Sequence, residues 1–287
     1  RGGGRERNVS PDGRLVLVFE DHNAALRTRE GGETQALTSD GTEAVSYRGQ
    51  VAWSPDSKFV AFMKHRGGGD PKVFYVDSSR RDQLQPKLES NDYLKPGDPI
   101  PQDRPVMFNA ESGEQVAFED ELFENPWSIS EMHFAPGGEL RFLYNQRGHQ
   151  VLRIVEVDAE TGAARALINE ESPTFIDYAH KEFTHYLDET HEIIWMSERD
   201  GWNHLHLYDA TTGDVKNQIT RGEWVVRGVE RVDDEQRQVW FRAGGVRPGQ
   251  DPYYVHFYRI NFDGTGLVAY TEADGNHDIS WSPDRRY

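Results

Sequence analysis

Residues 193–220 decide how the rest of the chain is interpreted, and they read IIWMSERDGWNHLHLYDATTGDVKNQIT. Three runs in this stretch are typical of β-strands, and turns at residues 197–201 and 209–214 separate them. The first turn ends in Asp-Gly, a pair that favours a tight turn because glycine tolerates positive φ without a Cβ clash. The stretch is therefore a β-meander, the unit from which an all-β repeat protein is built.

The middle run alternates between apolar and polar side chains. Leu205, Leu207 and the ring of Trp202 alternate with His204 and His206, which is the period of a half-buried strand. We therefore expect the two leucines and the indole to be buried. The two histidines have a spacing that can bind a metal, but cross-strand packing with hydroxyl or carbonyl partners is the simpler interpretation.

Composition limits the classes of partner. The chain has 287 residues, a formal net charge of -17 and no cysteine. A surplus of carboxylates argues against a nucleic-acid partner, since no basic surface is available to displace phosphate counterions. The absence of cysteine excludes disulfides and thiolate chemistry. No apolar run approaches the length of a membrane span, and no signal peptide is visible.

Two turn patterns recur along the chain in the same phase. The turn after the middle run recurs about every 50 residues, a period typical of a β-propeller. Its copies are at residues 109–113, 158–162, 209–213 and 261–266. A second pattern, Ser-Pro-Asp or a close variant, lies one hairpin earlier. Its copies begin at Ser10, Ser54, Ala135 and Ser282.

These markers predict an all-β protein, a β-propeller of four-stranded antiparallel blades with about five blades visible. The expected blades cover residues 9–38, 51–118, 128–167, 175–220 and 225–270, and a sixth begins at 279–284. The second blade is too long. Its excess, residues 77–105, is rich in proline, which removes ladder donors, so we interpret it as an excursion within one blade.

The stretch from Trp195 to Asp209 resembles a motif of the dipeptidyl peptidase IV propeller, in the prolyl oligopeptidase clan of serine peptidases. Further matches lie at residues 95–99, 145–150 and 220–224. The resemblance runs from about Ser10 to Tyr287 and implies an eight-bladed propeller followed by an α/β-hydrolase domain. On that basis we expect residues 1–287 to be one propeller domain, incomplete at both ends, with the hydrolase domain lying outside this sequence.

No residue of this chain is a candidate for catalysis. A nucleophile elbow requires Gly-x-Ser-x-Gly, and neither Ser112 nor Ser197 has that context. The segment should therefore be inactive alone, while the parent protein is expected to be a serine-type dipeptidyl peptidase. No HExxH pattern or complete calcium loop is present, so we expect no metal and no cofactor.

In the family it resembles, a short inserted helix with adjacent glutamates holds the free α-amine of the peptide. The corresponding interval here, residues 42–50, offers only Glu43 beside Arg48 and has no room for a helix. Since an ammonium group needs carboxylate partners, we expect the amine anchor to be displaced or absent. Asp92 and Asp98, in the excursion, are the candidate substitutes.

Two more candidates for substrate binding come from residues 175–180. The resemblance places Tyr178 where the family has a pocket-facing aromatic side chain, with a core tyrosine as the alternative. His180 follows in the same stretch. The adjacent pair Glu170-Glu171 is interpreted as a solvated turn.

Arg199 and Asp200, at the tip of the hairpin, are expected to form a local ion pair that fixes the corner of the blade.

Two functions remain open. In the first, the chain is the non-catalytic, substrate-gating propeller of a dipeptidyl peptidase IV-like serine peptidase. Its expected partners are a peptide and the α/β-hydrolase domain of the same parent chain, with a homodimer of the parent as a further candidate. In the second, it is a stand-alone periplasmic propeller that binds a protein partner. Both place the protein in the periplasm or outside the cell.

Overall fold

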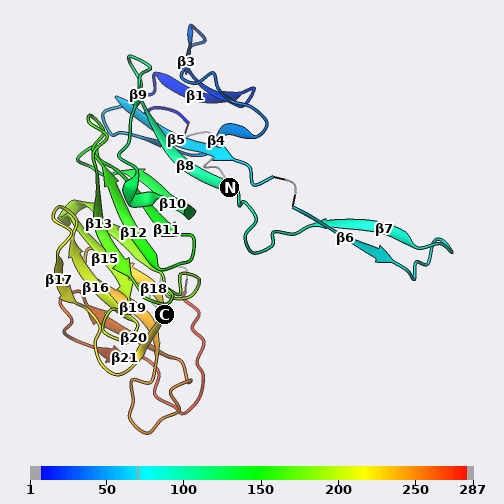
Figure 1. The fold of residues 1–287 in the computed structure, drawn as a ribbon. Helices are drawn as coiled ribbons and strands as arrows, with labels where there is room; N and C mark the ends of the chain where they lie inside the picture. Colours follow the sequence, from blue (N-terminus) through cyan, green and yellow to red (C-terminus); the bar gives the residue numbers. More distant parts are fainter. Residues whose placement is uncertain (1–7, 70, 283–287) are drawn as a thin grey trace. The chain divides into compact units, whose positions relative to one another are not determined.

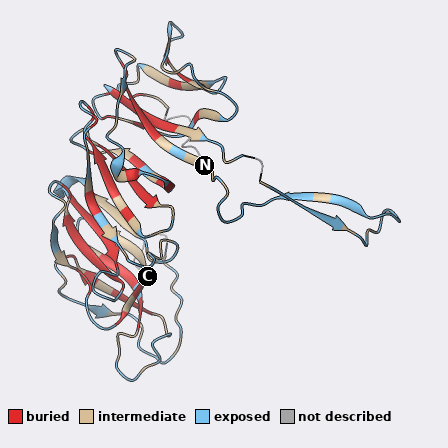
Figure 2. Cartoon of the chain, viewed as in Figure 1, coloured by how far each residue is buried: buried red, intermediate tan, exposed pale blue. Residues whose placement is uncertain are grey.

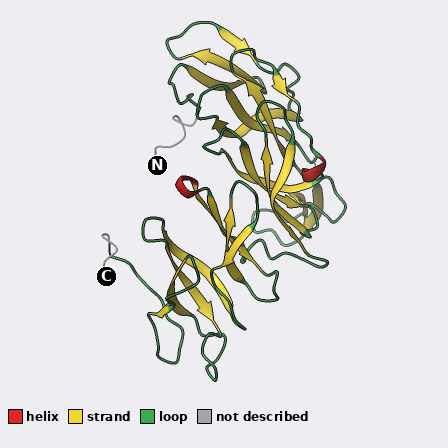
Figure 3. Ribbon diagram, turned by 90° about the vertical axis from the view of Figure 1, so that its left-hand side faces the viewer, coloured by secondary structure: helices red, strands yellow, loops and turns green. Residues whose placement is uncertain are grey.

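The computed structural model describes residues 8–69 and 71–282 of the chain. It is built almost entirely of strands and loops, with two single-turn 3-10 helices, Glu121–Phe123 and Asp188–Thr190 (Figure 3). The chain divides into two compact units. Unit 1 contains residues 1–147 and 154–165, and unit 2 contains residues 148–153 and 166–287. Among the described residues, no helix is long and apolar enough to cross a membrane.

The strands follow one another through turns and loops, with longer loops between β13 and β14 and between β19 and β20 (Figure 1). In chain order they are β1 Leu15–Glu20, β2 Asn23–Thr28, β3 Thr34–Ala36, β4 Val45–Trp53, β5 Phe59–Arg66, β6 Lys72–Asp77, β7 Lys87–Asp92, β8 Gln102–Asn109, β9 Gln115–Val116, β10 Pro126–Phe134, β11 Leu140–Gln146, β12 Val151–Val157, β13 Ala164–Glu171, β14 Thr184–Leu187, β15 Glu192–Ser197, β16 His204–Asp209, β17 Val215–Gln218, β18 Val225–Asp233, β19 Gln238–Gly244, β20 His256–Asn261 and β21 Val268–Ala269.

The sheets are antiparallel meanders with the strands of a propeller blade. Four have four strands, in the orders β4-β5-β8-β9, β10-β11-β12-β13, β14-β15-β16-β17 and β18-β19-β20-β21. A fifth sheet, β1-β2-β3, has three strands. Consecutive strands pair in nearly every case, as expected for blades that are built one after another. The predicted fold class, a β-propeller of antiparallel blades, is confirmed.

Both recurring turn patterns have a local physical cause. In the Ser-Pro-Asp pattern, Ser54 Oγ donates to Asp56 Oδ1 at 2.7 Å and accepts the N–H of Phe59 at 2.9 Å, which starts β5. In the second pattern, Asp158 Oδ1 accepts the N–H of Thr161 at 2.7 Å. Gly162 closes that turn with φ of 77°, and a Cβ there would lie 1.9 Å from a backbone oxygen. Only glycine fits this position.

The long second blade differs from its prediction at both ends of the excursion. Strands β6 and β7 form a separate two-stranded sheet, so the excursion includes regular structure before residue 77. At the other end, Pro105 lies inside β8 and pairs with Met63 of β5. The proline does not end the ladder there, because β8 continues through Asn109 with every pair in register. The excursion is thus a β-hairpin and a proline-rich return that ends before Gln102.

In unit 1, the sheets β1-β2-β3 and β4-β5-β8-β9 share one core. The rings of Phe62 and Phe108 stack with centroids 5.4 Å apart, and Phe19 and Tyr47 meet Phe62 edge-on. These side chains come from β1, β4, β5 and β8. Aromatic contacts of this geometry add to the free energy gained from burial.

In unit 2, the sheets β14-β15-β16-β17 and β18-β19-β20-β21 pack face to face (Figure 2). Leu205 and Leu207 of β16 lie in their shared core with Ile194 and Phe241, so the predicted burial of the two leucines is confirmed. The strand is not half-buried, however. All residues of β16 except its last are buried, because other side chains cover its second face. Trp202 is 40% exposed in the turn before β16, so its predicted burial is wrong.

The expected start of a sixth blade, at residues 279–284, is only partly within the described residues. Residues 279–282 carry no assigned strand, and residues 283–287 lie outside the described part of the chain.

Candidate functional site

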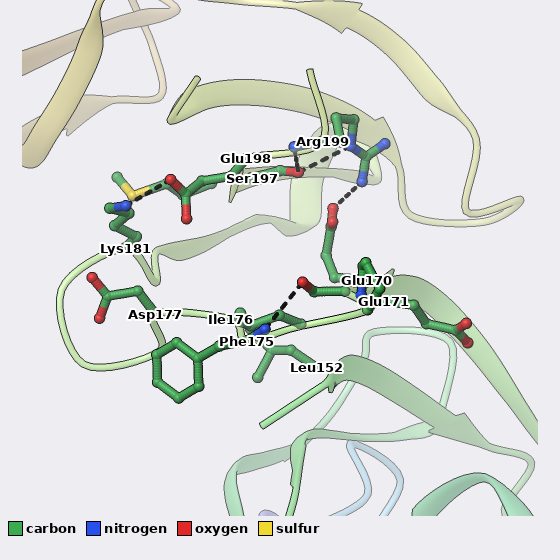
Figure 4. Close-up of a pocket in the computed structure, with 13 residues that line it drawn as sticks. Leu152, Glu170, Glu171, Phe175, Ile176, Asp177, Lys181, Ser197, Glu198 and Arg199 are labelled. Carbon is green, nitrogen blue, oxygen red and sulfur yellow. Dashed lines mark hydrogen bonds and ion pairs between the residues drawn. The ribbon is translucent and has the colours of Figure 1, made fainter. Parts of the chain in front are cut away.

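A pocket of about 250 Å³ opens in unit 2 beside the loop that joins β13 to β14 (Figure 4). Its walls come from β12, the end of β13, this loop and the turn after β15. The lining residues are Leu152, Glu170, Glu171, Ser172, Pro173, Phe175, Ile176, Asp177, Lys181, Met196, Ser197, Glu198 and Arg199. Six of these side chains are charged and five are apolar, so the pocket suits a group that is partly apolar and partly charged.

Backbone hydrogen bonds fix the loop that forms one wall. The N–H of Ile176 donates to the carbonyl of His149 at 2.7 Å, and that of Ser172 donates to Gln150 at 2.9 Å. Ser172 Oγ then accepts the N–H of Phe175 at 3.2 Å, the local turn that a serine offers to the residues after it. This turn leaves the ring of Phe175 at the surface, where it is 53% exposed.

Three rings form an aromatic group at this wall. His149 and Tyr178 stack with centroids 4.3 Å apart, and Phe175 meets His149 edge-on at 5.7 Å. Burial lowers the pKa of His149, so the imidazole is neutral at pH 7, which suits stacking on a phenol ring. His149 and Tyr178 support Phe175, and Phe175 is the ring that lines the pocket.

The opposite wall carries an ion pair between Glu170 and Arg199. Arg199 also donates from Nε to Ser197 Oγ at 3.0 Å, and Trp195 donates from Nε1 to Glu170 Oε1 at 3.2 Å. These bonds correct two predictions. Glu170 is not a solvated turn residue, since its side chain is only 14% exposed. Arg199 also pairs with Glu170 rather than with Asp200.

Asp200 instead serves the turn and the neighbouring strand. Its carboxylate accepts the N–H of Trp202 at 3.2 Å and the side-chain amide of Gln218 at 2.7 Å. Arg199 and Asp200 therefore meet different neighbours, although they are adjacent in the turn.

The other carboxylates of the pocket differ in their partners. Glu198 pairs with Lys181 at 2.6 Å, and Glu171 pairs with Arg153 at 3.0 Å. Figure 4 shows the Glu171 side chain directed away from the other labelled groups. Among the described residues, the ion-pair partner of Asp177 is the exposed imidazole of His180, at 3.0 Å. Asp177 is therefore the pocket carboxylate that lacks a permanent cation, and it lies beside the Phe175 ring.

His206 and Tyr208, which lie behind this wall, do not titrate near neutral pH. Burial and then the charge of Arg199 lower the pKa of His206 to about 4. Burial raises the pKa of Tyr208 to about 12, and the Arg199 guanidinium lies over its ring at 5.3 Å. His204 bonds Thr220 Oγ1 at 3.0 Å and the Gly222 carbonyl at 2.9 Å, as predicted for a packed histidine. This layer supports the pocket, and His206 and Tyr208 are not suited to proton transfer at pH 7.

No activated nucleophile is found among the residues that the structure describes. Ser197 is buried and accepts hydrogen bonds from the backbone and the Nε of Arg199, so its hydroxyl is held by a guanidinium rather than by a base. Ser112 lies in an exposed turn, where it bonds the N–H of Glu114. Within residues 8–69 and 71–282, no group of three or more His, Asp or Glu side chains is placed to hold a metal ion.

The four predicted substrate-binding residues lie in different units. Tyr178 and His180 belong to the pocket loop of unit 2, but neither lines the pocket. Asp92 and Asp98 belong to unit 1. Asp92 ends β7, opposite Lys72, and is exposed. Asp98 closes a turn by accepting the N–H of Lys95 at 2.9 Å.

The predicted absence of an inserted helix holds in the structure. Residues 45–50 of this interval already belong to strand β4, which starts at Val45.

Sequence reasoning missed the residues that line the pocket. The sequence predicts a pocket-facing Tyr178 rather than its neighbours Phe175 and Asp177, and it predicts a solvent-exposed Glu170. One local signal was available: Ser172-Pro173 after a strand predicts a turn that directs the following side chains outward.

The chain matches the family described as Dipeptidyl peptidase IV (DPP IV) N-terminal region over residues 6–287. It belongs to that family. Among curated relatives, the probable dipeptidyl-aminopeptidase B of Aspergillus oryzae is 24% identical over 97% of this chain. The dipeptidyl-aminopeptidase B of Aspergillus niger is 23% identical over the same share. This DPP IV N-terminal region spans 34% of the length of each of these relatives.

Solved structures show the same fold. The dipeptidyl peptidase 4 of Porphyromonas gingivalis matches with a TM-score of 0.65 and 20% identity, over 94% of this chain and 39% of that one. A putative dipeptidyl aminopeptidase IV from Bacteroides ovatus matches with a TM-score of 0.58 and 20% identity, over 90% of this chain and 38% of that one. The predicted family is confirmed.

Proposed function

We propose that this DPP IV N-terminal region is the non-catalytic, substrate-recognition part of a dipeptidyl peptidase-like serine peptidase. The observation that carries the proposal is the pocket of unit 2, whose exposed Phe175 ring and singly partnered Asp177 suit a peptide group. The chain itself lacks a nucleophile elbow. Its partners are then a peptide and an α/β-hydrolase domain of the same protein, in the periplasm or outside the cell.

The test compares turnover of a Gly-Pro chromogenic dipeptide by this region alone and by the protein that carries the hydrolase domain. The region alone should show none. In the whole protein, Phe175→Ala should raise KM about tenfold and leave kcat unchanged, because losing contact with about half a phenyl ring costs roughly 1.4 kcal/mol of ground-state binding. Tyr253→Ala removes another exposed aromatic ring, which lies outside the pocket, and is the control.

Turnover by the region alone would refute the non-catalytic role. An unchanged KM in Phe175→Ala would refute the assignment of the pocket.

Asp92 and Asp98 stay our candidates for a relocated amine anchor. The interval 42–50 supplies a single glutamate, and both aspartates lie in the excursion between β6 and β8. The same assay on X-Pro substrates with free and acetylated N-termini tests them. A preference for the free amine that is lost in Asp92→Asn or Asp98→Asn supports the relocated anchor, and a preference that is unchanged in both excludes it.

The β6–β7 hairpin favours a protein contact as well, and we propose a second copy of the chain as its occupant. Phe74, Val76 and Leu88 share one face and are each more than 60% exposed. The hairpin pairs with no other strand of the described chain, and both of its edges can accept an antiparallel copy of themselves. Sedimentation of wild type and Val76→Lys would test this, since a dimer that persists in the variant excludes the contact.

A further inference from the structure

Two histidines meet near the end of the described chain, far from the pocket in sequence. His256 begins β20, and His277 lies in the segment that follows β21. Their ring centroids are 4.8 Å apart, and the rings are tilted by 40°. His256 Nε2 and His277 Nδ1 are both buried without a hydrogen-bond partner. A buried ring nitrogen without a partner costs free energy, so this arrangement requires an explanation.

His256 is held in an orientation that leaves Nε2 available. The residue is 2% exposed, and its Nδ1 lies 3.1 Å from Thr271 Oγ1. The same hydroxyl oxygen accepts the N–H of Phe257 at 3.1 Å. Because a hydroxyl oxygen has two lone pairs, Thr271 Oγ1 can accept from Nδ1–H as well. In that tautomer Nε2 carries a free lone pair, which is the form of histidine that binds metals.

Two hydrogen bonds that do not involve the imidazole fix the position of His277. Its N–H donates to the carbonyl of Val255 at 3.2 Å. Asn276 Oδ1 in turn accepts the N–H of Val255 at 3.0 Å. These two bonds tie the segment to the residue just before β20, so the imidazole of His277 is brought beside that of His256.

The separation of the rings fits a shared metal ion. Zinc binds histidine nitrogen at about 2.0–2.1 Å, which places each ring centroid roughly 3.2 Å from the metal. Two imidazoles at neighbouring positions of a tetrahedral site then have centroids about 5 Å apart. The observed 4.8 Å is close to this value.

Charged groups of both signs lie near the pair. Arg247 is nearby and pairs with Glu272 at 3.5 Å. Asp274 is the other carboxylate close to His256, and it accepts the side-chain amide of Gln250 at 2.8 Å.

We propose that His256 Nε2 and His277 Nδ1 bind one divalent transition-metal ion, with Zn²⁺ best suited to two imidazole nitrogens. Since the two histidines are the protein ligands, water molecules fill the other positions, and the ion exchanges with solvent. The bound ion links the start of β20 to the segment after β21. This site is independent of the peptide pocket and of the proposed peptidase function.

The test is calorimetric titration of the chelator-treated protein with Zn²⁺. We expect one saturable site per chain and no binding of Mg²⁺, which prefers oxygen ligands. His277→Ala and His256→Gln should each weaken Zn²⁺ binding at least about 100-fold. Removing a group that only orients a metal ligand already weakens binding by up to about 100-fold, and these variants remove the ligand itself. His185→Ala, which removes a histidine paired with Asp234 elsewhere in unit 2, should leave binding unchanged.

Binding of Co²⁺ followed by its visible absorption provides a second readout. The d–d bands report nitrogen ligation directly, and circular dichroism without metal shows whether each variant is folded. The proposal is overturned if the wild type shows no saturable Zn²⁺ site, or if folded His277→Ala and folded His256→Gln bind Zn²⁺ as the wild type does.

Discussion

The β6–β7 hairpin and the β15–β16 pair are alike in backbone and opposite in burial. Each consists of two six-residue antiparallel strands paired in register throughout. In the hairpin, Phe74 is 64% and Val76 is 61% exposed. In the β15–β16 pair, Trp195 is 1% exposed and Ile194 is fully buried. Similar apolar residues pair equally well in both, so burial comes from what covers the two faces of a strand pair and not from the pairing itself.

The largest expected effect is in the buried pair. Trp195→Ala should lower the free energy of unfolding by about 3–5 kcal/mol, because it leaves a large cavity. It also removes one of the two hydrogen bonds that the Glu170 carboxylate accepts, the other being from Arg199. Urea melts measure the loss. Trp202→Ala is the matched control, since the 40% exposed indole in the turn should cost about 1 kcal/mol or less. Equal losses in the two variants would mean that burial does not separate these tryptophans.

A buried charge gives the next largest effect. Glu192, at the start of β15, is 3% exposed and accepts bonds from Arg237, Lys216 and Thr190. Glu192→Gln should cost about 2 kcal/mol at pH 7, because two cations lose a charged partner and must be resolvated. Glu89→Gln in the hairpin is the control. Its partners Arg80 and Lys87 are similar, but the pair is solvated, so the loss should stay below about 1 kcal/mol.

The pH dependence of the Glu192 effect has a defined sign. Burial would raise the pKa of this carboxyl, but the bonds from Arg237, Lys216 and Thr190 outweigh it and lower the pKa from 4.5 to about 2. The stabilisation is therefore complete above pH 4.5 and is lost as the pH falls toward 2. Urea melts between pH 7 and pH 2 should show the difference between wild type and Glu192→Gln shrinking. A difference that grows on acidification would contradict this assignment.

The smallest effect is expected on the exposed face of the hairpin. Measured on the monomer, Phe74→Ala should change the free energy of unfolding by no more than about 0.5 kcal/mol, because the ring makes few contacts within its own chain. Comparison with Trp195→Ala isolates the effect of burial, because that variant removes a buried ring from an equally regular strand pair. A loss above about 2 kcal/mol in Phe74→Ala would show that something covers this face.

Much of the architecture could be predicted from local chemistry. The Ser-Pro-Asp turns are stabilised by one serine hydroxyl and one carboxylate, as at Ser54 and Asp56, so their sequence is visible without the fold. Gly162 marks a turn because no side chain fits there. These turns fixed the number and phase of the strands. The pocket could not be found in this way, because Glu170 and Arg199 are 29 residues apart along the chain and meet only when β13 lies beside the turn after β15.

The sequence by itself determined that the chain folds into meanders, that these repeat about every 50 residues, and that no nucleophile elbow is present. Each depends on residues a few positions apart, and turn geometry and strand period act over that range. Only the tertiary structure decided that Trp195 is buried and Trp202 is exposed, that Arg199 pairs with Glu170, and that His256 and His277 meet. Burial and charge pairing depend on which faces and loops pack together, and that is a property of the assembled sheets and not of a sequence window.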